Sequence, residues 1–233
     1  MAQPFDPAGA ARWLAEAFET GNPLAALPEE IAPRDLGAAE EVAAATLAVL
    51  ELVPCGIRLL RRGGTTLSAP MVEGRLIGAG RPVATAALRH AEVTAAAIGV
   101  LAEPLDPDGD TPPVFARLHP ALDIAATRFT APPEDSVTLT ADLARLGLVV
   151  AGKAKAMAPA TLRVALGAKG VRVRGAELDL AAAFAEAAVA ARRWGGLPAG
   201  ALLVVAGLTP PRPPEGVLRA SLGALGSVEA SFA

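Results

Sequence analysis

The last forty residues carry the clearest pattern of apolar and polar positions. Residues 201–206 are a continuous apolar run of the length expected for a buried strand. Residues 207–216 contain four prolines, which exclude both a helix and a central strand. In residues 217–222 apolar and polar positions alternate, and after a glycine-bounded turn at 223–226 the chain returns through 227–232. This pattern predicts a β-hairpin with one buried face.

Three segments show the signals of helices. Asp6 precedes a proline and caps a predicted helix over residues 10–19, whose large apolar side chains share one side. Asp35 caps a second, over residues 36–52, where apolar residues recur at helical spacing. A third helix begins after Asp179 and runs to about residue 194, although its many alanines leave its apolar face poorly defined.

The middle of the chain predicts strands. They are expected at residues 55–61, 92–101, 121–129, 147–151 and 161–166, with the last of these forming a hairpin with 171–174. Helices concentrate at the start and strands dominate afterwards, without a regular β-α alternation. We therefore predict an α+β fold, with an N-terminal helical segment over residues 1–54 and a β-rich domain over residues 55–233.

Composition narrows the class of protein. Hydrophobic residues make up 52% of the chain and the mean hydropathy is +0.41, yet no uncharged stretch reaches the ~18–20 residues of a membrane span. The first six residues show no basic region of a secretory signal. A chain this apolar is expected to bury surface in subunit contacts, as a homo-oligomer or as a hetero-oligomer with a related subunit.

Cysteine content and charge exclude further classes. The single cysteine, Cys55, rules out an internal disulfide and suits a reducing cytoplasm, where we expect the protein to be located. A net charge of −3 and a pI near 5.5 do not indicate nucleic acid or anionic lipid as a partner. With no tyrosine and 3% aromatic residues, base-stacking platforms are not expected either.

The C-terminal segments also resemble a known family. Leu197–Pro211 followed by Val217–Glu229 resembles, in order and spacing, the C-terminal end of the 2-keto-4-pentenoate hydratases, which belong to the fumarylacetoacetate hydrolase superfamily. The resemblance implies a mixed β-sandwich roll with N-terminal helices, assembled as an oligomer. It also implies ancestry in aromatic catabolism, as lyases that add water to 2-hydroxypenta-2,4-dienoate-type 2-oxo acids through a metal-bound enolate.

Family members bind Mg²⁺ or Mn²⁺ with a Glu-x-Glu pair on one strand and an acid in a later segment. That later segment survives here as Pro120–Ile124, which retains Asp123. The Glu-x-Glu pair is not found in this chain, because Thr94 and Ala96 occupy positions close to those of the two glutamates. Glu92 has the correct face parity but lies one strand period or more away, a shift of ~6–7 Å. An octahedral Mg²⁺ site with oxygen ligands does not tolerate this shift unless the strand is re-registered.

Other positions of the family's pocket have changed as well. Arg58 replaces the family's lysine, and it either holds a substrate carboxylate with its planar fork or is a strand arginine that reaches solvent. His119 precedes the Asp123 segment and either enters the pocket or has a capping or surface role. Leu143 and Arg145 stand where members of the family have an asparagine, with its amide, and a serine, with its hydroxyl group. The candidate pocket residues are thus Arg58, His119 and Asp123, with Asp123 as the single retained ligand position.

Other motifs predict no chemistry. The acids in residues 106–110 have their glycine at the wrong position for a calcium loop, and Arg117 stands where its bidentate glutamate should be. Residues 78–80 lack the third glycine of a dinucleotide-binding turn. No cofactor is therefore predicted, and Mg²⁺ or Mn²⁺ is expected only if the ancestral site is rebuilt.

Two hypotheses about function follow. One is a divergent hydratase-like enzyme with a degenerate metal site, which keeps a 2-oxo-acid pocket and uses Asp123 and Arg58 with a rearranged metal site or with none. The other is a non-catalytic binding or partner subunit, comparable to the paired hydratase–decarboxylase complexes of the family, that keeps the hydratase scaffold.

Overall fold

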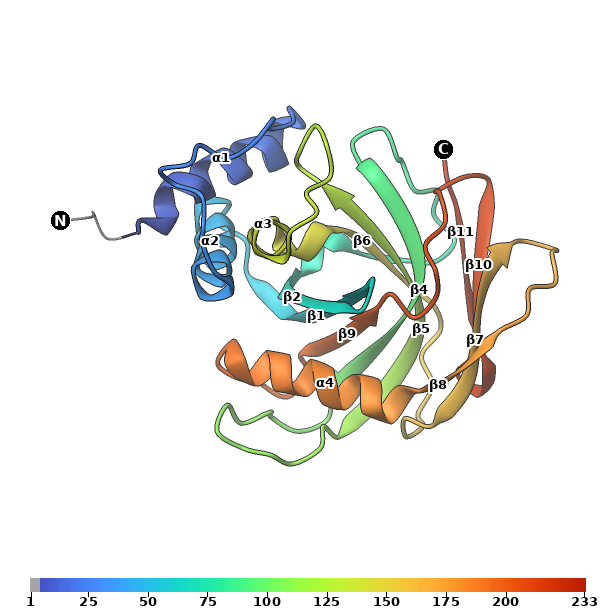
Figure 1. Cartoon of the computed structure of the whole chain (residues 1–233). Coiled ribbons are helices and arrows are strands. Elements are labelled where there is room, and N and C mark those ends of the chain that lie inside the picture. Colours follow the sequence, from blue (N-terminus) through green and yellow to red (C-terminus); the bar gives the residue numbers. More distant parts are fainter. Residues whose placement is uncertain (1–4) are drawn as a thin grey trace.

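The computed structural model describes residues 5–233 and consists of two β-sheets with helices at one end and along one side (Figure 1). The larger sheet has the strand order β2-β1-β9-β4-β5-β6-β3. Its strands are β1 (Pro54–Arg62), β2 (Thr65–Val72), β3 (Leu76–Gly78), β4 (Arg89–Leu101), β5 (Phe115–Thr127), β6 (Leu146–Ala151) and β9 (Leu202–Ala206). The smaller sheet has the order β11-β10-β7-β8, formed by β7 (Thr161–Ala168), β8 (Ala176–Asp179), β10 (Val217–Leu222) and β11 (Ser227–Ser231).

Strand β9 comes late in the chain but lies in the centre of the larger sheet. It runs parallel to β1 and antiparallel to β4, so that Val204 is level with Arg58 on one side and with Ile98 on the other. Its apolar sequence fits this position, since a central strand is covered on both faces. As a result, the end of β1 and the proline-rich segment after β9 meet at the same edge of the molecule.

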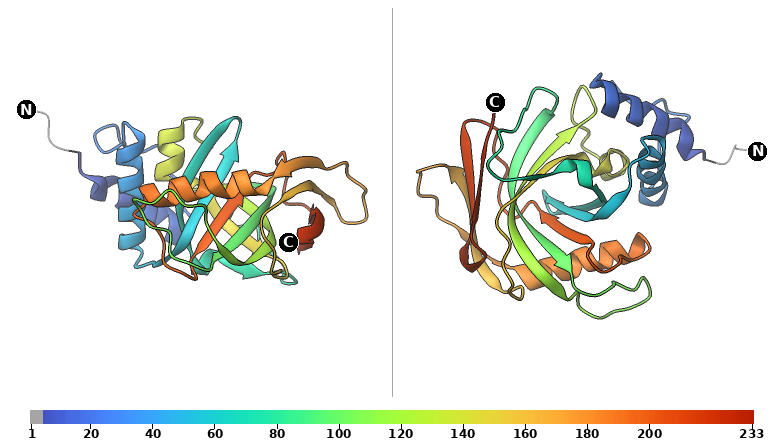
Figure 2. Two further views of the ribbon diagram at one scale, coloured as in Figure 1. Left: turned by 90° about the horizontal axis from the view of Figure 1, so that it is seen from below. Right: turned by 180° about the vertical axis from the view of Figure 1, so that it is seen from behind.

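Four helices are longer than one turn within the described residues: α1 (Pro7–Thr20), α2 (Leu36–Val49), α3 (Ser136–Ala141) and α4 (Leu180–Arg193). Each begins at an aspartate whose side chain accepts a hydrogen bond from a backbone N–H of the first turn; these are Asp6, Asp35, Asp135 and Asp179. Figure 2 shows α1 and α2 at the end of the molecule opposite β10 and β11. None of the helices in residues 5–233 combines the length and apolar character needed to cross a membrane.

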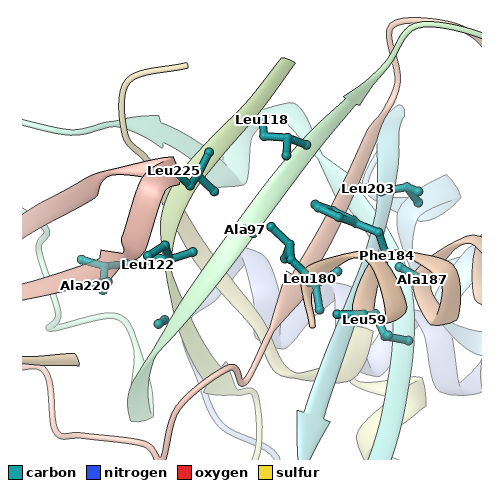
Figure 3. Close-up of a cluster of buried hydrophobic side chains, with 14 of the residues drawn as sticks. Leu59, Ala97, Leu118, Leu122, Leu180, Phe184, Ala187, Leu203, Ala220 and Leu225 are labelled. Atoms are coloured by element: carbon teal, nitrogen blue, oxygen red, sulfur yellow. The ribbon is translucent and has the colours of Figure 1, made fainter. Parts of the chain in front are cut away.

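The two faces of the larger sheet build separate parts of the core. Alternate residues of β1 and β9 point to opposite sides, so Leu59 and Leu203 belong to the cluster that includes Phe184 of α4 and the smaller sheet (Figure 3). Leu60 and Val204 belong to a second cluster, which α2, α3 and the turn after α3 help to form. This second, inner face is where Arg58 lies.

The expected elements agree with the structure except in a few places. Residues 171–174 are not a strand; β7 pairs instead with β8, and Val171 is 63% exposed. The alternation of valine and arginine at 171–174 is typical of a strand, but no neighbouring strand pairs with it. Strand β2 was not predicted, because three of its first four residues are polar, and the short elements α3, β3 and β8 were not predicted either. The division at residue 54 stays a prediction, because α2 contacts both α3 and β2.

Candidate functional site

A pocket of about 720 Å³ opens where the end of β1 and the segment after β9 meet the starts of β2 and β4. Its volume lies within the range of small-molecule sites. The lining side chains and backbone come from Leu60, Arg61, Arg62, Gly63, Gly64, Thr65, Thr66, Glu92, Thr94, Ala125, Arg145, Glu186, Gly207, Leu208, Thr209, Pro210 and Pro211.

The pocket has an excess of positive charge. Arg61 donates to Oε2 of Glu186 from Nε at 3.0 Å and from Nη2 at 2.8 Å. Arg62 lies farther from its partner, with Nη2 at 3.4 Å from each carboxylate oxygen of Glu92. Arg145 also pairs with Glu92. Three guanidinium groups against two carboxylates leave one positive charge, which suits an anionic ligand.

Arg145 reaches the pocket from a left-handed turn. Leu143, Ala144 and Arg145 have φ values of 51°, 48° and 60°, a conformation that costs a non-glycine residue about 1–2 kcal/mol. The turn brings Nη1 of Arg145 to 2.6 Å from Oε2 of Glu92 and Nη2 to 2.8 Å from the carbonyl oxygen of His90. The Arg145 side chain is 1% exposed, so its position is determined by these contacts.

Two threonines add hydroxyl groups to the wall of the pocket. The hydroxyl of Thr94 accepts a hydrogen bond from the N–H of Gly207 at 3.0 Å, and the hydroxyl of Thr209 accepts one from the N–H of Ala95 at 3.1 Å. These bonds join β4 to the segment after β9. Because each hydroxyl acts as an acceptor in them, each keeps its proton for donation to a ligand.

Arg58 and Asp123 form a buried ion pair and are not among the residues that line the pocket. Nε of Arg58 lies 2.6 Å from Oδ1 of Asp123, and Nη2 lies 2.7 Å from Oδ2. Nη1 donates to the carbonyl oxygen of Ala144 at 2.7 Å. Both side chains are fully buried. The fork of Arg58 therefore engages a carboxylate of the protein itself, and this arginine does not reach solvent.

The structure does not bring His119 to this pocket. His119 and Asp123 lie four residues apart on β5, which corresponds to about 13 Å along a strand. Nδ1 of His119 is 2.9 Å from the carbonyl oxygen of Gly152, in a partly buried position.

Sequence reasoning did not identify most of the charged lining residues. Arg145 was recognised only as a replacement, while Arg61, Arg62 and Glu186 were not singled out. Glu186 lies on α4 and is 125 residues from Arg61 in sequence. The charges of Arg61 and Arg62 directly before the Gly63–Gly64 turn were the one local signal, but their partners depend on the tertiary fold.

The residues present do not fit a divalent metal ion. Mg²⁺ and Mn²⁺ need free oxygen ligands. Both oxygens of Asp123 are held by Arg58, and the carboxylate of Glu92 is held by Arg145 and Arg62. Thr94 lies directly opposite Asp123 in the β4–β5 pairing and supplies a neutral hydroxyl. Across residues 5–233, no three His, Cys, Asp or Glu side chains are placed to hold a metal together.

The protonation of Glu92 links the pocket to pH. Burial by itself raises the pKa of Glu92, but the hydrogen bonds and charges of Arg145 and Arg62 outweigh burial, and the pKa of Glu92 lies below its ordinary value. A lowered pKa in the folded state stabilises the fold above the unfolded pKa of about 4.3, and this contribution is lost as the pH falls through the folded pKa.

We therefore expect Glu92→Gln to lower the stability at pH 7 and to weaken its dependence on pH between about 5 and 3. Solvent screening limits the effect to about 0.5–1 kcal/mol, since the Glu92 side chain is 33% exposed. Urea unfolding across this pH range measures it. Glu177→Gln, at a glutamate that is 75% exposed, is the control and should follow the native curve. An unchanged acid dependence in Glu92→Gln would contradict the expectation.

No family model and no curated protein matches the sequence. Among solved structures, 4-oxalocrotonate decarboxylase from Pseudomonas putida G7 is similar to this chain, with 17% identity and 97% of each chain covered. The TM-score is 0.77 for its complex with calcium and acetate and 0.78 for its complex with magnesium and adipate.

A second enzyme shares a smaller part of the structure. The 2-hydroxyhepta-2,4-diene-1,7-dioate isomerase from Mycobacterium marinum aligns with a TM-score of 0.56 and 11% identity, over 78% of this chain and 76% of its own. At such identities the likeness shows the fold, and it agrees with the α+β roll and N-terminal helices expected from the sequence. This chain therefore has the fold of the fumarylacetoacetate hydrolase superfamily, to which these enzymes belong.

Proposed function

We propose that this chain is a divergent hydratase-like protein with a degenerate metal site, whose pocket binds a small 2-oxo acid without a divalent metal ion. The observation that carries the proposal is the buried Arg58–Asp123 pair, in which one guanidinium group engages both oxygens of the acid at the retained ligand position. Opening this pair to admit a metal would leave an unpaired charge in the interior, which is strongly unfavourable.

The other lining groups support binding more than acid–base chemistry. No histidine, cysteine or lysine lines the pocket in the described part of the chain. The lowered pKa of Glu92 makes its carboxylate a weak base. An arginine guanidinium does not give up a proton at neutral pH. These residues offer charge and hydrogen bonds to an acid, and the two lining carboxylates, Glu92 and Glu186, are already engaged by arginine side chains.

The similar solved structures favour an acidic ligand. The decarboxylase from Pseudomonas putida G7 is described in complexes with acetate and with adipate, which are both carboxylates. Those complexes also contain calcium or magnesium. We infer that this chain kept a pocket for a carboxylate and replaced the positive charge of the metal with arginine side chains.

The proposal predicts ligand binding that does not depend on metal. Calorimetric titration with 2-oxopentanoate should give the same affinity in excess EDTA and in saturating Mg²⁺ or Mn²⁺. Titration with either metal alone should give no binding heat. In parallel, ultraviolet absorbance should show no metal-stimulated loss of 2-hydroxypenta-2,4-dienoate. Affinity or turnover that appears only with metal would contradict the degenerate site, and turnover in EDTA would show that the pocket is catalytic without metal.

A second candidate function is the non-catalytic partner subunit. It is favoured by large apolar side chains left exposed on and after the N-terminal helices, namely Trp13 at 46%, Leu36 at 51%, Val49 at 48% and Val53 at 81%. Such side chains are typical of surfaces that are covered in an assembly. Sedimentation of the purified chain, alone and with a hydratase-fold subunit, tests for a homo-oligomer or a hetero-oligomer. A monomer under both conditions would contradict this candidate.

A further inference from the structure

Backbone strain converges on one side chain of the pocket. The turn at Leu143, Ala144 and Arg145 is left-handed throughout, and His90 has a φ of 48° as well. The two strained segments meet in the hydrogen bond from Nη2 of Arg145 to the carbonyl oxygen of His90. Strained backbone of this kind persists only where the surrounding structure holds it, and it gathers at functional sites. Here its result is to present the Arg145 guanidinium at the inner wall of the pocket.

The hydrogen bonds of Arg145 are incomplete. Its Nη1 and Nη2 donate to Glu92 and to His90, but its Nε is buried and has no acceptor within residues 5–233. A buried donor without a partner is rare and unfavourable. Arg62 is also weakly engaged, at 3.4 Å from Glu92 and with its side chain 40% exposed. The guanidinium groups of Arg145 and Arg62 therefore both have hydrogen-bond donors that are not fully used, in a pocket with one excess positive charge.

The other residues that line the pocket indicate which chemical group of the ligand carries the anion. Leu60, Ala125 and Leu208 are apolar, and Pro210 and Pro211 add to this apolar surface. An unbranched aliphatic chain would remove this surface from water. Thr94 and Thr209 also line the pocket, and their hydroxyl groups, which accept backbone hydrogen bonds, can donate to an oxygen of the ligand.

We propose that Arg145, assisted by Arg62, binds the carboxylate of the ligand, and that the apolar chain of the ligand lies along Leu208–Pro211, so that the pocket selects one carboxylate over two. One carboxylate matches the single excess charge, whereas a second would lie against the apolar wall without a partner. This inference rests on the proposed function and names the residue that sets its specificity.

Calorimetry with three probes tests the inference in excess EDTA. The probes are 2-oxopentanoate, the neutral ketone pentan-2-one and the dicarboxylate 2-oxoglutarate. Native protein should bind 2-oxopentanoate at least ten-fold more tightly than either of the others. Arg145→Gln should weaken 2-oxopentanoate at least ten-fold and Arg145→Lys less, because lysine keeps the charge but loses the planar fork. Arg163→Gln, at an exposed arginine of β7, is the matched control and should bind like native protein.

The possible results distinguish failure of the role of Arg145 from failure of the proposed metal-independent binding. Equal affinity of native protein and a folded Arg145→Gln variant for 2-oxopentanoate would overturn the role of Arg145 and leave metal-independent binding intact. Absence of binding to native protein, or binding only when metal is added, would overturn the proposed function itself. If Arg145→Gln does not fold, native protein and Arg145→Lys decide the question, and equal affinity for the acid and the ketone in native protein would overturn recognition of the carboxylate.

Discussion

Asp123→Ala is expected to destabilise the protein by about 3–5 kcal/mol. The substitution would leave the Arg58 guanidinium fully buried with one remaining acceptor, the carbonyl oxygen of Ala144. An uncompensated charge in the interior has a cost of this size. Urea unfolding at pH 7 measures it as the change in the extrapolated free energy of unfolding.

The matched control removes both charges together. In Arg58→Met with Asp123→Leu, nonpolar side chains replace the ion pair, and such exchanges are often neutral or stabilising. We expect the double variant to unfold within about 1 kcal/mol of the native protein. A single Asp123→Ala variant that is as stable as native protein would contradict the buried pair. The same reasoning means that activity lost in Asp123→Ala would reflect lost folding and would not identify a catalytic group.

Phe184→Ala is expected to have an effect of similar size, about 3–5 kcal/mol, through loss of packing. Phe184 is fully buried on the side of α4 that faces the larger sheet, near Leu59 and Leu203 (Figure 3). Its ring centroid lies 4.5 Å from that of Phe115, which adds an aromatic contact to the buried area. Truncation to alanine leaves a cavity between the helix and the sheet. Thermal and urea unfolding should both show the loss.

Val189→Ala on the same helix is the control for that variant. Val189 is 57% exposed, so its truncation removes little buried surface, and alanine has the better helix propensity. We expect a change within about 0.5 kcal/mol. Equal effects of the two substitutions would show that α4 does not pack on the sheet through Phe184.

Most of the regular elements were predictable because their signals are local. The aspartate caps, the apolar run of β9 and the alternation in β10 each occupy a few consecutive residues. The hairpin expected with residues 171–174 was wrong, since an alternating pattern does not say whether a partner strand is present. Strand β5 was predicted as residues 121–129 and begins earlier, at Phe115, where its exposed face is polar.

The candidate site was less predictable than the fold. Thr94 and Ala96, near the expected positions of the glutamate pair, could be read from the sequence. For Arg58 the sequence left open a substrate carboxylate or exposure to solvent, and the structure shows neither. That the partner of Arg58 is Asp123 was not visible, because 65 residues separate the two and their strands, β1 and β5, are not neighbours in the sheet. Arg145 is separated from Glu92 by 53 residues and reaches it only through a left-handed turn that its sequence does not favour.

The amino-acid sequence by itself determined the fold class, most helix ends and the absence of a glutamate pair, because these depend on residue type and short-range spacing. Only the tertiary structure decided which charges neutralise each other, since ion pairs depend on distances between segments far apart in the chain. That is why Asp123 could be aligned with the family's ligand position from its neighbours in sequence, while its engagement by Arg58 required the folded chain.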